Sequence, residues 1–310
     1  MTVVNHEVVY GFLRFEKSRN SYGQYTMVIS FLKDEFVYGG HLLAVMVSLL
    51  SLSTMLVIGE GLRVEFLGIS YLFCQSVYQY NHYKELDVDK QGNSRRTMHL
   101  LKYSTLFPIL IVGYVIGFVS LLVVFGNLAS IVFGLLLLMG GFLYTWKGKQ
   151  MTEKIVGFKT FFTTGVAACF ILFTSVYHTG FIALHTIVFS LFCFLNFTVN
   201  TSLCDVKDMQ TDTRQGLQTF PVFFGRKRFF NVFQLLCLVS GFPLIVGVVL
   251  NILPPYTLFL LFSVLYQLVV IHKARQEKAD IQKLSSIVLD GEQVLWPGLL
   301  FLGMSLFAVF

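Results

Sequence analysis

The sequence predicts an all-α, polytopic membrane protein with nine transmembrane helices, built as two four-helix units plus a ninth helix. Of its 310 residues, 55% are hydrophobic and only 13% are charged, whereas about a quarter of the residues in a soluble domain are charged. Apolar runs long enough to cross a bilayer, about 20 residues as a helix, recur along the whole chain. The basic residues gather in alternate connections, which is the pattern of a membrane topology.

These apolar runs define the domain organisation. Residues 1–37 are predicted to form a cytoplasmic or interfacial N-terminal segment, with a flexible tail as the alternative. Residues 38–310 form a single transmembrane domain with halves 38–147 and 154–271 and a ninth helix, 294–310. The nine predicted helices span residues 38–59, 66–83, 103–126, 128–146, 156–177, 181–203, 229–250, 256–271 and 294–310.

The distribution of basic residues predicts how the helices are oriented. With the exception of Arg63, all 23 Lys and Arg residues lie before the first predicted helix or in and beside the connections that lead from an even to an odd helix. The positive-inside rule places these segments and the N-terminus in the cytoplasm, and the C-terminus on the opposite side. The connections on the opposite side are short, so neighbouring helices should run antiparallel.

Composition also excludes several classes of protein. The net charge of +6 follows from the topology, so we expect a lipid bilayer as the surroundings and no nucleic-acid partner. The five Cys residues are scattered, and nearly all lie in apolar runs. They predict neither a disulfide framework nor a zinc site.

An acidic stretch follows the sixth predicted helix. Asp205, Asp208 and Asp212 recur at spacings of three and four, so they share one face of a helix. Carboxylates so close together repel one another, and burial near a membrane adds a desolvation cost. An oxygen-only cluster of this kind is suited to Mg²⁺, often shared with a diphosphate. The alternative is a solvated acidic loop.

A second polar stretch follows the second predicted helix. Asn81, Glu85 and Asp89 recur every four residues and therefore share a helical face, whereas Asp87 points elsewhere. Both stretches are predicted on the cytoplasmic side, each at the end of the second helix of a four-helix unit. Membrane proteins built from repeats often bind their ligand between the halves. The pair therefore predicts a magnesium and diphosphate site.

The two stretches resemble the motifs of the UbiA superfamily of intramembrane prenyltransferases. The first motif of that family is similar to Asn-Asp-x-x-Asp-x-x-x-Asp, and the chain has His82 and Glu85 in place of the first two Asp residues. The family's Arg-Pro pair before the first helix has no counterpart here, which leaves the acceptor open. The second motif, Asp-x-x-x-Asp-x-x-x-Gly followed by Thr-x-Pro, is matched by Asp208, Asp212, Gly216, Thr219 and Pro221.

The resemblance implies Mg²⁺-dependent transfer of a prenyl group from a polyprenyl diphosphate to an aromatic or quinone-precursor acceptor, by ionisation of the allylic diphosphate. The implied metal and diphosphate ligands are Asn81, Glu85, Asp89, Asp205, Asp208 and Asp212. The implied catalytic residues are Glu85, Asp89, Asp208, Asp212 and Lys147.

Other polar residues are candidates for supporting roles. Candidates to hold the departing diphosphate are Lys147, Lys207, Arg214, Arg95, Arg96 and Tyr144. Each of the cations could instead be a surface charge that sets the topology. The candidates for the acceptor site are His41 and His82, and for His41, as for His185, a hydrogen bond between helices is the alternative.

Two other functions fit parts of the pattern. A membrane terpene cyclase of the same superfamily would ionise the same substrate and capture the cation within the molecule; Glu85 and the missing Arg-Pro pair keep this alternative open. A cation-coupled transporter would place acidic residues at a repeat interface. Against it, the carboxylates here lie at helix ends and away from the membrane midplane.

Overall fold

A computed structural model describes residues 21–89, 94–276 and 291–307. Every regular element in these ranges is a helix, as predicted for an all-α protein. The predicted N-terminal segment lies largely outside the described residues, but its last part forms helix α2 (Ser21–Tyr38).

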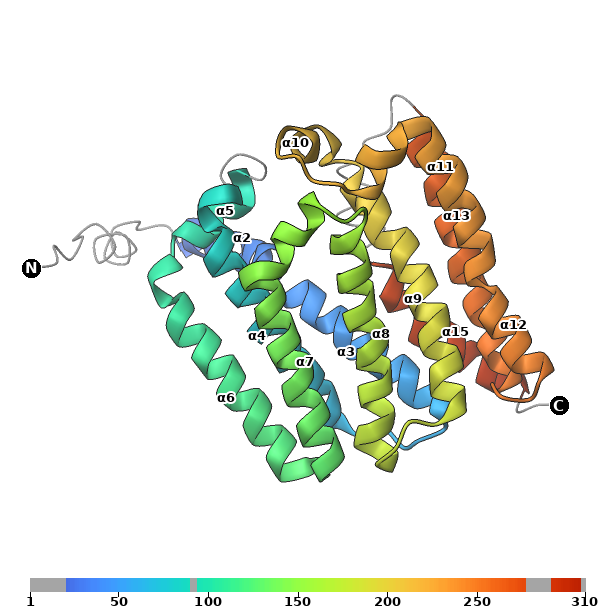
Figure 1. The fold of residues 1–310 in the computed structure, drawn as a ribbon. Coiled ribbons are helices and arrows are strands. Elements are labelled where there is room, and N and C mark those ends of the chain that lie inside the picture. The colour runs from blue at the N-terminus through green and yellow to red at the C-terminus, as the bar shows by residue number, and fades with distance from the viewer. Residues whose placement is uncertain (1–20, 90–93, 277–290, 308–310) are drawn as a thin grey trace, which may run out of the picture.

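The first half of the bundle contains five helices after α2. They are α3 (His41–Ile58), α4 (Val64–Asp89), α5 (Ser94–Leu101), α6 (Phe107–Phe125) and α7 (Leu128–Lys147). Short 3-10 turns precede α6 at Ser104–Leu106 and follow α7 at Gly148–Glu153. Helix α5 and the end of α4 lie at one end of the bundle, and the turn between α6 and α7 lies at the other (Figure 1).

The second half repeats this order. It comprises α8 (Phe158–Thr179), α9 (Leu184–Asp205), α10 (Met209–Arg214), α11 (Phe220–Ser240), α12 (Phe242–Val249), a 3-10 turn at Pro255–Leu260, α13 (Leu261–Arg275) and α15 (Glu292–Phe307). Helix α4 packs on α3, α6 and α7, and in the same way α9 packs on α8, α11 and α13. Helix α3 contacts both halves through α4, α8 and α9, and it also contacts α15.

Within the described ranges, seven helical segments are long and apolar enough to cross a membrane. They are His41–Ile58, Ser104–Phe125, Leu128–Lys147, Phe158–Thr179, Leu184–Asp205, Phe220–Val249 and Pro255–Arg275. Helix α4 is longer than any of the other helices but ends in a polar stretch, and α15 has only 16 residues. The chain is therefore an integral, multi-pass membrane protein.

Polar residues continue one predicted helix and open another. Helix α4 runs to Asp89, so the first polar motif is helical, as its four-residue spacing predicted. The helix predicted to begin at residue 229 begins at Phe220, since the basic residues Arg226–Arg228 had been assigned to a loop. Its path bends at Gly225, whose φ of 68° is unfavourable for a residue with a side chain.

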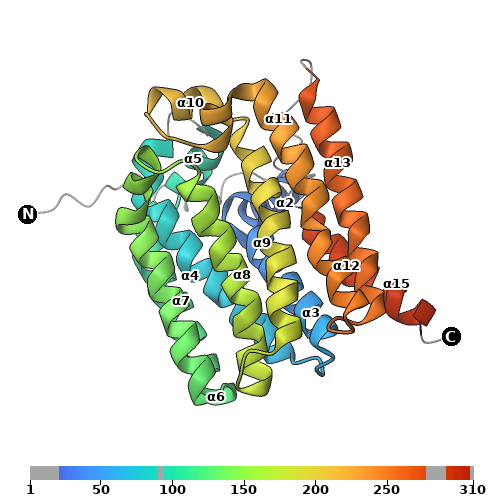
Figure 2. The ribbon, with the colours of Figure 1, turned by 45° about the vertical axis from the view of Figure 1, so that its right-hand side comes forward.

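Short turns join the helices at the end opposite the motifs. The backbone leaves α3 at Gly59 and α8 at Gly180, both in the left-handed conformation that favours glycine. Asn127 caps α7 by accepting a hydrogen bond from the Ser130 amide at 2.8 Å. These turns leave the longer connections, with α5 and α10, gathered at the motif end of the bundle in both views (Figures 1 and 2).

Candidate active site

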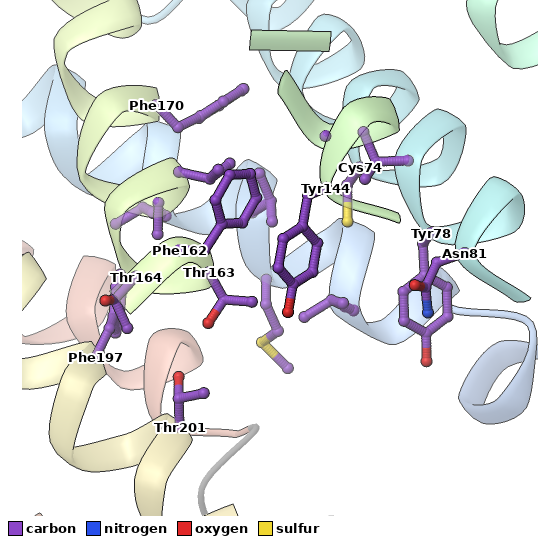
Figure 3. A pocket seen from close by; sticks show the side chains of 18 of the residues that line it. Cys74, Tyr78, Asn81, Tyr144, Phe162, Thr163, Thr164, Phe170, Phe197 and Thr201 are labelled. Atoms are coloured by element: carbon purple, nitrogen blue, oxygen red, sulfur yellow. The ribbon is translucent and has the colours of Figure 1, made fainter. Parts of the chain in front are cut away.

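A cavity of about 470 Å³ lies between α3, α4, α7, α8 and α9, below the motif end. Its walls are mostly aliphatic and aromatic side chains. Tyr78 and Asn81 line it from α4 on one side, and Thr164 and Phe197 line it from α8 and α9 on the other (Figure 3). The cavity therefore offers an apolar chamber whose mouth, beside Asn81, is polar.

Lys159 brings a positive charge to the mouth of the cavity. Its ammonium Nζ lies 2.7 Å from Asp205 Oδ1, and Thr160 Oγ1 donates to Asp205 Oδ2 at 3.3 Å. The Asp205 side chain is only 3% exposed. Lys159 lines the cavity, so this ion pair places a cation where the apolar chamber meets the acidic motif.

Asp208 and Asp212 follow Asp205 at the same end. Asp212 is buried, and its Oδ2 accepts a hydrogen bond from Thr219 Oγ1 at 3.1 Å. Burial raises the pKa of Asp212 to about 6, with neighbouring carboxylates adding to the rise and the Lys159 charge and the Thr219 hydrogen bond opposing it. Burial also raises the pKa of Asp208, although Lys207 and Lys159 oppose the rise. A nearby cation stabilises the charged form of such buried carboxylates.

The first motif is described in part. Asn81 Nδ2 donates to Glu85 Oε2 at 3.0 Å, so these two residues share a face of α4 as predicted from their spacing. The side chain of Asp89 lies outside the described side chains. Among the side chains that the structure describes, no three His, Cys, Asp or Glu residues are grouped closely enough to hold a metal ion by themselves.

The candidate cations fall into two groups. Arg96, on α5, lies close enough to Asp208 to lower its pKa. Lys147, Lys207 and Arg214 are exposed, and Lys147 lies over the Trp146 ring at 4.7 Å. None of these three lines the cavity, whereas Lys159 does. The side chain of Arg95 is outside the described side chains.

Tyr144 extends from α7 into the cavity. Its ring stacks on Phe162 with centroids 4.1 Å apart and planes within 7° (Figure 3). Its hydroxyl is buried and has no hydrogen-bond partner among the described residues. This hydroxyl is thus a donor without an acceptor on the wall of an apolar chamber.

The histidines considered for the acceptor site do not lie together at one site. His41 belongs to a polar cluster between α2, α3 and α4, where it bonds to the Tyr71 hydroxyl and lies 3.3 Å from Glu35 Oε1. His82 is buried with its ring edge-on to Tyr78 at 4.1 Å. His185 lies in the first turn of α9 and is therefore at the end opposite the motifs.

Sequence reasoning missed three polar groups. Lys159 falls within the helix predicted at 156–177 but had been counted only among the charges that set the topology; it lies on α8 and faces Asp205. Glu35 accepts hydrogen bonds from His99 Nε2 at 2.7 Å and Tyr103 at 3.1 Å. Glu292 is fully buried and accepts from Asn200 Nδ2 at 3.0 Å. Lys159 and Glu292 are charged residues in the first turn of an apolar helix. This position was the sequence signal that could have identified them as buried partners.

The site is an apolar chamber within a helical membrane bundle, with carboxylates and a cation at its mouth. Such a site in a membrane protein can bind a lipophilic molecule with a charged head group. The sequence pattern of the UbiA prenyltransferase family matches residues 41–289. The chain belongs to this family of prenyltransferases, as the two motifs suggested. A comparison with curated protein sequences finds no match.

Solved structures share the fold. A UbiA homologue from Aeropyrum pernix K1 superposes with a TM-score of 0.67 at 12% identity, covering 86% of this chain and 97% of that one. A UbiA homologue from Archaeoglobus fulgidus bound to GPP and Mg²⁺ gives 0.62 at 13% identity, covering 88% and 99%. A structure described as digeranylgeranylglyceryl phosphate synthase gives 0.55 at 13% identity, covering 88% and 97%.

Proposed function

We propose that this protein transfers a prenyl group from a prenyl diphosphate to an aromatic or quinone-precursor acceptor within the membrane. The observation that carries the proposal is the junction of an apolar cavity with the Lys159–Asp205 ion pair and the buried carboxylates of the second motif. An isoprenoid tail gains free energy by leaving water for such a cavity. A diphosphate, by contrast, needs cations and hydrogen-bond donors.

The residues of the two motifs suit Mg²⁺, which an Archaeoglobus fulgidus relative binds together with GPP. Burial raises the pKa of Asp208 and of Asp212 because it disfavours their charged forms. A hard cation would stabilise the charged carboxylates, and both side chains offer oxygen ligands. We assign Asp208, Asp212, Asn81, Glu85 and Asp89 to this ion. When bound, Mg²⁺ supplies positive charge that neutralises the diphosphate.

The protein's own groups have separate tasks in the proposed reaction. Lys159 and the Tyr144 hydroxyl face the position of the diphosphate and donate to its oxygens as its charge increases. The bond between the allylic carbon and the diphosphate oxygen breaks, and the oxygen keeps the electron pair. The outer face of the stacked Tyr144–Phe162 pair lies beside the resulting allylic cation and stabilises it. An electron-rich carbon of the acceptor then attacks the allylic carbon and loses its proton to the released diphosphate.

Asp205 has a supporting role in this proposal. Both of its carboxylate oxygens already accept contacts from Lys159 and Thr160. Arg96 is proposed to complete the positive side of the site from α5, since it interacts with Asp208. We retain Lys147, Lys207 and Arg214 as charges that set the topology, because all three side chains are exposed.

The proposal includes a nine-span topology with the site on the cytoplasmic side. Helices α4 and α15 would cross the membrane together with the seven apolar spans, because α4 packs between α3, α6 and α7 and α15 packs against α3 and α13. The strong bias of Lys and Arg towards one side supports this orientation. Labelling of a Cys residue introduced at Asn127 or at Gln215, in a variant whose five native Cys residues are replaced, tests it. Only the Cys at position 127 is expected to react with a membrane-impermeant reagent added on the non-cytoplasmic side.

Removal of a motif carboxylate tests the function. In detergent with Mg²⁺ and an aromatic acid acceptor, Asp208→Ala and Asp89→Ala should reduce consumption of prenyl diphosphate by at least about a hundredfold, because a metal ligand is lost. Glu60→Ala, an exposed carboxylate at the opposite end, is the matched control and should keep full activity. Full turnover by both motif variants, or by the wild type after chelation of Mg²⁺, would refute the proposal.

The same assay separates transfer from cyclisation. Without an acceptor, a transferase should leave geranyl, farnesyl and geranylgeranyl diphosphates largely unchanged. Release of a cyclic hydrocarbon under these conditions would favour the terpene cyclase.

A further inference from the structure

One residue on each of the five surrounding helices marks the deep end of the cavity lining, and these five residues are called its floor. Helices α3 and α8 run away from the mouth, and their last lining residues are Leu50 and Phe170. Helices α4, α7 and α9 run towards the mouth, and their first lining residues are Phe73, Gly141 and Phe197. Three of these five residues are phenylalanines, and Phe170 is labelled in Figure 3.

Phe73 and Phe170 form a packed pair within this floor. Their ring centroids are 5.0 Å apart, and the two side chains are 6% and 1% exposed. Phe170 packs on Phe173 at 5.4 Å, and Phe73 packs on Phe118 at 5.8 Å. Further rings therefore pack against both members of the pair, so neither ring can move aside without disturbing a packed core.

The depth above this floor can be measured along the helices. Phe170 follows Lys159 by 11 residues on α8, and Phe197 precedes Asp205 by 8 residues on α9. At 1.5 Å per residue these separations are about 16 Å and about 12 Å. An extended isoprene unit adds four carbon–carbon bonds, or about 5 Å. The space between the ion pair and the floor thus holds two to three isoprene units.

We propose that Phe73 and Phe170 determine the chain length of the donor, and that they limit it to three isoprene units. This inference rests on the proposed function, since it takes the cavity to be the site of the isoprenoid tail. A geranyl or farnesyl tail fits above the two rings. The fourth unit of a geranylgeranyl tail meets them, and the head group then cannot reach Lys159 and the motif carboxylates.

Binding of three diphosphates to the purified protein with Mg²⁺ tests the proposal. Competition against radiolabelled geranyl diphosphate should show that farnesyl diphosphate binds at least as tightly as geranyl diphosphate, and that geranylgeranyl diphosphate binds at least about tenfold more weakly than farnesyl diphosphate. Phe170→Leu and Phe73→Leu should each improve geranylgeranyl binding about tenfold and change geranyl binding little. Phe233→Leu, which removes the same atoms from a buried site on α11 outside the cavity, should leave the order unchanged.

A substitution of the opposite kind adds a ring nearer the mouth, so that the cavity becomes shallower and no packed side chain is removed. Ala167 lines the cavity on α8 at a position nearer the mouth than Phe170. Ala167→Phe should weaken farnesyl binding about tenfold more than geranyl binding. If the Leu variants do not fold, the Ala167→Phe variant alone tests whether the floor limits the chain length.

The outcomes are distinguishable. Equal affinity of the wild type for farnesyl and geranylgeranyl diphosphates, or folded variants that leave the ratio unchanged, would overturn the role of the floor. In that case the proposed function stands. Failure of all three diphosphates to bind the folded wild type would instead refute the proposed function.

Discussion

The ion pair between Lys159 and Asp205 determines the charge at the mouth of the cavity. Asp205 is 3% exposed and Lys159 is 34% exposed, so the carboxylate depends on the ammonium more than the reverse. A buried charge that loses its partner keeps its desolvation cost without the compensating attraction. The pair therefore has two effects that can be measured separately, one on stability and one on the diphosphate.

Lys159→Met should lower both stability and donor affinity. We expect a loss of about 2 kcal/mol in the free energy of unfolding, less than for a fully buried pair because Lys159 is partly exposed. The double variant Lys159→Met/Asp205→Asn should recover most of this stability, since the unpaired carboxylate is gone. It should not recover binding of geranyl diphosphate, because the cation is still missing. Thermal unfolding and binding of the labelled diphosphate measure the two quantities; recovery of binding in the double variant would contradict this role.

At the scale of elements, a cluster around Glu35 joins α2 to the bundle. Glu35 lies on α2 and accepts from His99 on α5 at 2.7 Å, while His41 at the start of α3 lies 3.3 Å away. Helix α5 also carries Arg96, which interacts with Asp208. The cluster therefore holds in place the helix that brings this arginine to the candidate site.

The Glu35 cluster predicts a dependence of stability on pH. Burial acts to raise the pKa of Glu35, but hydrogen bonds from His41, His99 and Tyr103 and the charge of His99 outweigh it and lower the pKa from 4.5 to about 2. A carboxylate whose pKa is lowered by folding stabilises the protein above its unfolded pKa. This contribution, roughly 3 kcal/mol from the size of the shift, is lost as the pH falls from about 5 to 2.

Comparison of the wild type with Glu35→Gln isolates this contribution. The wild type should be more stable at pH 7, and the difference should shrink below pH 5 and vanish near pH 2. Chemical unfolding at a series of pH values measures it. A difference independent of pH would show that Glu35 acts through packing and not through its charge.

The sequence predicted the elements better than the contacts between them. Apolar runs located the helices because lipid exposure requires them, and motif spacing grouped Asn81 with Glu85 because both lie on one helix. The start of the helix at Phe220 was missed, because basic residues lie within an apolar helix there. The partners of the site were missed because they are distant in sequence: Lys159 and Asp205 are 46 residues apart, and Asn200 and Glu292 are 92 apart. Local patterns carry no information on such pairs.

At the scale of the whole molecule, a buried polar network joins the last helix to the second half. Glu292 Oε2 at the start of α15 accepts from Asn200 on α9 at 3.0 Å and from Gln267 on α13 at 2.8 Å. Gln267 also donates to Asn196 Oδ1 at 3.0 Å. Asn200 lines the cavity, so the network fixes a part of the cavity wall as well as the position of α15.

Loss of the Glu292 carboxylate should loosen the bundle and disturb the cavity together. In Glu292→Leu the amides of Asn200 and Gln267 lose a buried acceptor, and at about 1–3 kcal/mol for each unsatisfied group we expect a loss of about 4 kcal/mol. Glu292→Gln keeps one acceptor oxygen for both amides, and we expect it to cost about half as much. Thermal unfolding in detergent should rank the proteins wild type, Gln, Leu, and binding of farnesyl diphosphate should weaken in the same order because the wall at Asn200 shifts. A stable Glu292→Leu protein with unchanged binding would show that hydrophobic packing alone holds α15 against the bundle, and that the cavity wall is independent of the network behind it.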